Sequence, residues 1–178
     1  DVVSSSFTSA GQRCSALRVL FLQEDIADRV LDVMKGAMEQ LTIGNPSSVK
    51  TDVGPVIDAT AKANLNAHID HIKQVGKLIN QLELPAGTEN GHFVAPTAVE
   101  IDSIKVLEKE HFGPILHVIR YKAADLAKVI DEINSIIEKL KWEDGDEIVV
   151  EVGGTVVSGI NQGENYNEKW ATPFGVRK

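Results

Sequence analysis

The sequence predicts an α/β domain, with a mostly parallel sheet and helices on both of its faces. Short runs of branched apolar residues, typical of buried strands, alternate along most of the chain with longer segments whose apolar residues recur at helical spacing. Turn-forming residues separate these segments. At 178 residues, of which 43% are hydrophobic, the chain is long enough for one domain with a substantial core and would be cramped as two.

The first half of the chain predicts one strand and two helices. The apolar run at 17–22 predicts a buried strand. From Asp25 to about Gly44, apolar residues recur at helical spacing, which predicts an amphipathic helix that lies against the sheet. A loop-like stretch with two prolines follows, and Asp58 is placed to cap a second helix that extends to Gly76.

Two histidines lie in the second predicted helix. His68 and His71 fall near the edge of its apolar stripe, three residues apart. This spacing is compatible with a metal ion, but no third ligand is evident nearby, and histidines on a polar helix face are much commoner. We therefore expect both side chains on the polar face and predict no metal site.

The second half of the chain predicts further strands and one more helix. Turn formers at 85–96 lead into a short extended segment, and the run at 115–121 predicts a strand. Apolar residues at helical spacing begin near Ala124. Beyond this helix, Asp144-Gly145 and Gly153-Gly154 are turn signals around two runs of valine and isoleucine, which predict a hairpin.

Charge and composition disfavour several classes of function. The formal net charge of −8, with scattered basic residues, argues against nucleic acid as a partner. No apolar run approaches the roughly 18 residues needed to cross a bilayer, and the first residues lack the features of a signal peptide. We therefore expect a cytoplasmic protein without a membrane span. The single cysteine, Cys14, cannot form an internal disulfide, so any role it has is that of a thiol.

Cys14 lies in the small and polar segment SFTSAGQRCSALR, residues 6–18. A thiol becomes a strong nucleophile when a helix N-terminus, a cation or a base lowers its pKa. Gly11 permits close backbone approach, and main-chain N–H groups around the thiol could face an oxyanion. On residue types alone, an inert buried thiol is the better-supported interpretation. The candidate bases for a papain-like dyad are His92, His111 and His117.

A series of ordered motifs resembles the aldehyde dehydrogenase superfamily. FTSAGQRCSALRVL is similar to that superfamily's catalytic-cysteine segment, and the motifs TIGNP, TDVGPVID, GHFVAPT and EKEHFGPILHVIRY follow in the expected order. Over residues 6–134 the chain is most similar to the L-glutamate γ-semialdehyde (pyrroline-5-carboxylate) dehydrogenase module of bacterial bifunctional proline utilization enzymes (proline utilization A).

The resemblance implies covalent catalysis on an aldehyde substrate in proline catabolism. The Cys14 thiolate would attack the aldehyde, a hydride would leave for NAD, and the resulting thioester would be hydrolysed to a carboxylic acid. By the same resemblance, Glu110 would hydrogen-bond the nicotinamide ribose and Phe112 would pack beside the nicotinamide ring. Ser15 would help to hold the substrate carboxylate, and Arg13 would help to shape the catalytic loop.

Two departures from the family pattern change what we expect of this chain alone. The family's dinucleotide-binding domain, its water-activating glutamate and its oxyanion-hole asparagine lie largely upstream, and no G-x-G-x-x-G fingerprint replaces them here. From about residue 135 the sequence diverges, and Val176 stands where the family's closing loop has its second glycine. We therefore expect 1–178 to be a single catalytic-cysteine domain with a rebuilt part at 135–178.

Such a domain would not complete a full turnover alone, and the NAD-binding domain is a candidate partner in trans. No flavin site is evident in the sequence. Two alternatives stay open: an engineered, non-catalytic structural or folding fragment that retains the fold, or a cysteine esterase or thioesterase remnant. Because removal of a partner domain exposes an apolar face, we also expect self-association.

Overall fold

The structure is a computed structural model that describes the backbone of residues 1–140, 147–152 and 155–160 and the side chains of residues 1–135. The described strands are β1 (Val19–Gln23), β2 (Lys77–Gln81), β3 (Thr97–Glu100), β4 (Ile115–Tyr121), β5 (Glu147–Val152) and β6 (Thr155–Ile160). They form one sheet in the order β2-β3-β4-β1-β5-β6. Neighbouring strands are parallel in the middle of the sheet and antiparallel at its two ends, where β2 pairs with β3 and β5 with β6.

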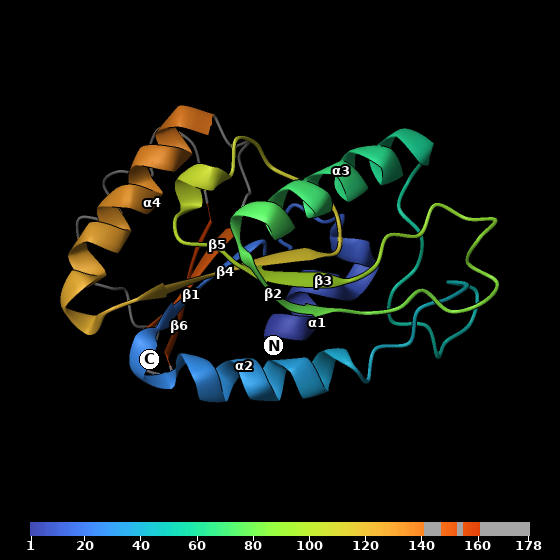
Figure 1. The fold of residues 1–178 in the computed structure, drawn as a ribbon, viewed down its shortest axis with the longest axis horizontal. Coiled ribbons are helices and arrows are strands. Elements are labelled where there is room, and N and C mark those ends of the chain that lie inside the picture. The colour runs from blue at the N-terminus through green and yellow to red at the C-terminus, as the bar shows by residue number, and fades with distance from the viewer. Residues whose placement is uncertain (141–146, 153–154, 161–178) are drawn as a thin grey trace.

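Helices cover both faces of this sheet (Figure 1). They are α1 (Val2–Phe7), α2 (Glu24–Met38), α3 (Ala59–Val75) and α4 (Leu126–Leu140), with short 3-10 turns η1 (Thr8–Gly11), η2 (Ile104–Val106) and η3 (Ala123–Asp125). In Figure 1, α3 and α4 lie on one face, and α1 and α2 lie on the other. The predicted α/β fold with a mostly parallel sheet is therefore confirmed. No helix among the described residues is long and apolar enough to cross a membrane.

The core is built on the two inner strands β1 and β4. Leu20, Phe21 and Leu22 of β1 are fully buried, as is Leu116 of β4. Strands of a parallel sheet that is covered on both faces are buried on both sides, so their sequences are continuous apolar runs rather than alternating ones. This is why the runs at 17–22 and 115–121 could be recognised as strands from the sequence.

The hairpin predicted from valine and isoleucine runs is also present, because β5 and β6 pair as antiparallel strands from Glu147–Ile160 to Val152–Thr155. The turn signals Asp144-Gly145 and Gly153-Gly154 themselves, and Val176, lie outside the described residues. Among the α-helices and strands, α1 and β2 were not predicted. β2 carries polar residues such as Asn80 and Gln81 without an apolar alternation, so its pairing with β3 determines its conformation.

Asp58 caps α3, as the sequence predicts. Its carboxylate Oδ1 accepts a hydrogen bond from the Ala61 N–H at 2.7 Å. We expect Asp58→Ala to lower the free energy of unfolding by about 1 kcal/mol, because the first turn of α3 loses this acceptor. Urea denaturation measures the change, and Asp58→Asn is the matched control because asparagine retains a capping oxygen. Equal losses in the two variants would contradict the capping role.

Candidate functional site

Cys14 lies at the tip of a tight turn just before β1. The Ala16 N–H donates to the Arg13 carbonyl at 3.1 Å and closes the turn, with Cys14 and Ser15 between them. The side chains of Arg13, Cys14 and Ser15 are all exposed. The interpretation of Cys14 as a buried thiol is therefore wrong, because the residue is exposed.

The chain enters this turn through a left-handed stretch. Ser9, Ala10 and Gly11 have φ angles of 58°, 52° and 65°. For residues other than glycine this conformation costs roughly 1–2 kcal/mol each, and such residues are often found at functional sites. At Gly11 a Cβ atom would overlap the carbonyl of Gly113, so the cysteine segment and the segment before β4 touch at their main chains.

Gln12 anchors the turn on its other side. Its side-chain Oε1 accepts from the Ile57 N–H at 2.8 Å, and its Nε2 donates to the Pro55 carbonyl at 3.3 Å. These bonds attach the TDVGPVID loop to the cysteine segment. Ile57 itself is 82% exposed beside this anchor. Gln12 was not among the predicted site residues.

Arg18 links the turn to Glu110 and Phe112. Its Nη1 donates to the Ala16 carbonyl at 2.6 Å and its Nη2 donates to the Arg13 carbonyl at 2.9 Å. Its Nε lies 2.8 Å from Glu110 Oε1, and its guanidinium carbon lies 4.3 Å from the centre of the Phe112 ring. The structure thus connects Cys14 with two predicted site residues that follow it by nearly a hundred positions.

Arg18 was missed as a site residue, although the sequence carried a signal for it. It interrupts the apolar run LRVLFL at 17–22, which predicts a buried strand. A guanidinium inside such a segment needs ionic or hydrogen-bonding partners, because an unpaired buried charge is costly. Its side chain is only 7% exposed, and that of its partner Glu110 is 14% exposed.

Three histidines, of which His68 and His117 are buried and His111 is half-buried, form a cluster beneath this part of the site. His117 Nδ1 lies 2.9 Å from the Arg18 carbonyl, which can only accept, so this nitrogen carries a hydrogen. In neutral His117 the Nε2 is then an acceptor, and it receives the Nε2–H of His68 at 3.0 Å. The His68 ring stacks on the His111 ring, with centroids 3.5 Å apart.

The expectation for the two helix histidines is half right. His71 is exposed, as predicted for a polar face. His68 is only 8% exposed, so its predicted place on the polar face is wrong. The physical reason is that α3 packs His68 against the His117 ring of β4, and this partner comes from 49 residues away in sequence.

Burial is the main cause that lowers the pKa values of all three histidines. The pKa of His68 falls to about 3, because of burial and then of the neighbouring His111 and His117. Burial and Lys109 lower the pKa of His111 to about 4. Burial also lowers the pKa of His117 to about 4, against the opposing effect of its bond to the Arg18 carbonyl. The cluster is therefore neutral at physiological pH.

His92, His111 and His117 were the candidate bases for a papain-like dyad. Among the described residues, no hydrogen bond places any of them as a base for Cys14. Both ring nitrogens of His117 are already used, and the His111 ring is stacked on His68. His92 is exposed, and its carbonyl accepts from the Val56 N–H. Among the described side chains there is also no group of three or more metal-ligating residues placed to hold a metal ion.

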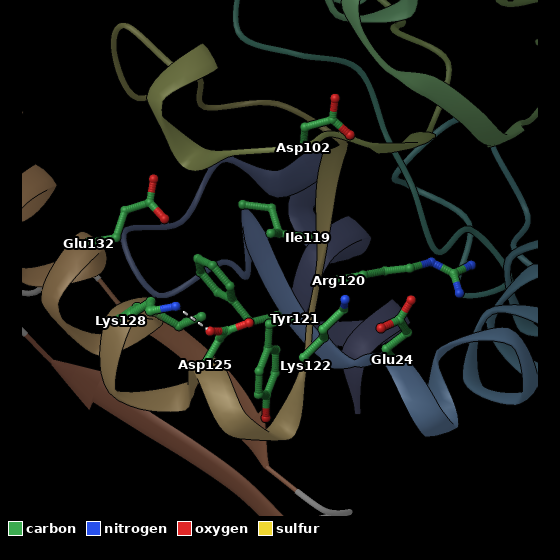
Figure 2. A pocket seen from close by; sticks show the side chains of 11 residues that line it. Glu24, Asp102, Ile119, Arg120, Tyr121, Lys122, Asp125, Lys128 and Glu132 are labelled. Carbon is green, nitrogen blue, oxygen red and sulfur yellow. Dashed lines mark hydrogen bonds and ion pairs between the residues drawn. The ribbon is translucent and has the colours of Figure 1, made fainter.

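A cavity of about 430 Å³ lies at the opposite end of the same strands, where β1 and β4 end. Its lining carries both signs of charge, and two of its cations, Lys128 and Arg120, form ion pairs. Lys128 pairs with Asp125 at 2.6 Å, as Figure 2 shows. Arg120 pairs with Asp28 at 2.7 Å and with Glu100 at 2.9 Å. We therefore place the candidate site at Cys14, where the strands begin, and not at this cavity.

The arrangement at the beginning of β1 and β4 offers an exposed thiol, a largely buried carboxylate and a half-exposed aromatic ring, since Phe112 is 45% exposed. A carboxylate accepts hydrogen bonds from hydroxyl groups, and a ring face packs on a flat ligand. A carboxylate and an exposed ring face of this kind are groups that can hold the ribose and the ring of a nucleotide.

Comparisons with known proteins identify relatives of this chain. It matches the Aldehyde dehydrogenase family over residues 1–139. It is 48% identical over 140 residues to the bifunctional protein PutA of Klebsiella aerogenes, a match that covers 76% of this chain and 11% of that protein. PutA of Escherichia coli (strain K12) matches with the same identity and the same coverage. The chain thus spans about a tenth of the length of these curated relatives.

Solved structures agree with these matches. A mutant of proline utilization A from Bradyrhizobium japonicum superposes with a TM-score of 0.69 at 43% identity, over 84% of this chain and 17% of that one. A 1-pyrroline-5-carboxylate dehydrogenase from Thermus with bound NAD superposes with a TM-score of 0.63 at 32% identity, over 75% of this chain and 25% of that one.

Proposed function

Because the chain belongs to the aldehyde dehydrogenase family, we propose that it is the catalytic-cysteine part of an NAD-dependent enzyme that oxidises L-glutamate γ-semialdehyde to glutamate in proline catabolism. The observation that carries the proposal is the exposed Cys14 turn, joined through Arg18 to Glu110 and Phe112. The PutA relatives and the Thermus dehydrogenase structure support the substrate, and the NAD bound in that structure supports the cofactor.

In this proposal Cys14 is the nucleophile. Its thiolate adds to the aldehyde carbon, a C–S bond forms, and the carbonyl electron pair moves to oxygen. Main-chain N–H groups of the turn would stabilise the resulting oxyanion. Ser15, exposed beside the thiol, would donate to the substrate carboxylate. Arg13 would shape the turn through its carbonyl, which accepts from both Ala16 and Arg18.

Glu110 and Phe112 would hold the nicotinamide riboside end of the cofactor, with Glu110 accepting from ribose hydroxyls and Phe112 packing on the ring. NAD supplies a hydride acceptor when it is bound. Cys14 then carries the acyl group as a thioester, until water releases the carboxylate and the thiol is regenerated. We propose that a dinucleotide-binding domain, in cis or in trans, supplies the rest of the NAD site and the base for this water.

An exposed thiol also favours a second candidate function, a cysteine esterase or thioesterase, because acylation of the thiol requires no cofactor. A non-catalytic domain that keeps only the fold is the third possibility. The predicted break at about residue 135 and the predicted self-association stay predictions.

The rate of Cys14 alkylation by iodoacetamide tests the nucleophile. We expect the folded chain to react faster than the same chain in guanidinium, most clearly below about pH 8.5, where an ordinary thiol is mostly protonated. Because Cys14 is the single cysteine, Cys14→Ser is the control and should take up no label. A folded rate at or below the unfolded one would favour the non-catalytic domain.

Two further assays separate the enzymatic alternatives. NADH formation from L-glutamate γ-semialdehyde, after addition of a dinucleotide-binding domain, would support the dehydrogenase. Acylation of Cys14 by a simple aryl ester, seen by intact mass and followed by turnover without NAD, would favour the esterase. Neither activity should survive in Cys14→Ser.

A further inference from the structure

We propose that Arg18 is the positioning residue of this site, which holds the Cys14 turn and the Glu110–Phe112 pair in one arrangement. The inference rests on the proposed function, because the arrangement matters for catalysis only if Cys14 is the nucleophile. Arg18 itself is not placed against the substrate. It acts through the residues that it holds.

The side chain of Arg18 contacts both parts of the site at once. Two of its nitrogens donate to carbonyls of the turn, from Arg13 at 2.9 Å and Ala16 at 2.6 Å. The third nitrogen pairs with Glu110 at 2.8 Å, while the guanidinium lies 4.3 Å from the Phe112 ring centre. The planar guanidinium directs these donors in fixed directions, which the single ammonium of a lysine cannot reproduce.

The main chain of Arg18 is fixed as well. Its carbonyl accepts from the His117 N–H and from His117 Nδ1, both at 2.9 Å. His117 lies in β4, directly opposite Val19 of β1. The guanidinium therefore extends from a residue whose main chain is bonded to β4 and leads directly into β1. The segments that precede these two strands are held relative to this residue.

The ion pair between Arg18 and Glu110 is largely buried. The side chains of Arg18 and Glu110 are only 7% and 14% exposed, so their ion pair is largely shielded from solvent. Replacing one partner of a buried pair is costly, whereas the intact pair specifies a geometry more than it adds stability. A positioning role is consistent with such a pair.

Arg120 of β4 provides a matched control. It also bridges two carboxylates, Asp28 at 2.7 Å and Glu100 at 2.9 Å, but it lies near the opposite end of β4 and its side chain is 25% exposed. A general effect of replacing an ion-paired arginine by lysine would be seen in both Arg18→Lys and Arg120→Lys. A positioning effect would be seen only in the first.

The test compares the wild-type chain, Arg18→Lys and Arg120→Lys, each folded. We expect Arg18→Lys to change the Cys14 alkylation rate, and its dependence on pH, by about fivefold or more. We also expect it to speed hydrogen exchange of the Ala16 amide by about tenfold, because its acceptor at Arg13 loses the bond from Arg18. Arg120→Lys should leave both measurements at their wild-type values.

The inference is overturned if both measurements in Arg18→Lys match the wild type, or if Arg120→Lys changes them equally. Failure of the proposed function looks different, because the wild-type thiol would then react no faster than the unfolded reference, whatever Arg18 does to the exchange of Ala16. If Arg18→Lys does not fold, Glu110→Gln takes its place. It should shift both measurements in the same direction and by less, and unchanged values would overturn the inference.

Discussion

Replacing Gly11 by alanine is expected to lower the free energy of unfolding by roughly 2–5 kcal/mol, the sum of a left-handed backbone penalty and of overpacking. Gly11 has a φ of 65°, and an added Cβ would overlap the carbonyl of Gly113. The obstacle is main chain that is bonded into the sheet, since the Ile115 N–H donates to the same carbonyl. Domains are stable by only about 5–15 kcal/mol, so a loss of this size removes a large share.

Urea denaturation followed by circular dichroism measures this loss. Gly36→Ala is the control: Gly36 lies exposed in α2, and a Cβ there has no heavy atom within 4 Å. We expect Gly36→Ala to stabilise the chain by up to about 1 kcal/mol, as alanine does in an exposed helix interior. Gly113→Ala should be milder than Gly11→Ala, because its Cβ meets the end of the Leu65 side chain, which can move. Equal stability of wild type and Gly11→Ala would show that the two segments do not touch.

Acidification is expected to destabilise the fold between about pH 6.5 and about pH 4. The pKa values of His68, His111 and His117 are lowered to about 3, about 4 and about 4, chiefly by burial. In the unfolded chain these groups titrate near 6.5. The unfolded chain therefore binds more protons in this window, so the stability is fully present above pH 6.5 and is lost as the pH falls towards the folded values. Each proton taken up on unfolding contributes a slope of about 1.4 kcal/mol per pH unit.

The hydrogen-bond geometry of the histidine cluster also predicts that acid destabilises the fold. A second hydrogen on His117 would place two N–H groups against each other across the 3.0 Å contact with His68. Urea midpoints measured from about pH 7 to about pH 4 give the slope. We expect His68→Gln to flatten it, because one of the titrating groups is removed. His71→Gln should change it much less, because His71 is exposed and lowers the pKa of His68 less than burial, His111 and His117 do. A slope that is identical in wild type and His68→Gln would exclude the cluster as its source.

Much of the fold could be predicted because its determinants are local. The segments 17–22 and 115–121, which predicted β1 and β4, consist mostly of buried apolar residues, and the Asp58 cap depends on an N–H three residues away. Strand β2 could not be predicted in this way, since its polar residues become a strand only through the backbone of β3. The candidate site shows the same difference between local determinants and those that depend on tertiary packing. Cys14 and its turn are local, whereas the link to Glu110 depends on the packing of β1 against β4.

By itself, the sequence determined the α/β class, most element types and the residues proposed for the chemistry, because apolar periodicity, helix capping and short motifs are contained within a few neighbouring positions. Only the tertiary structure decided that Cys14 is exposed, that Arg18 joins it to Glu110, and that His68 is buried. The partners of these side chains come from distant strands and helices, so their burial and pairing exist only once the sheet has assembled.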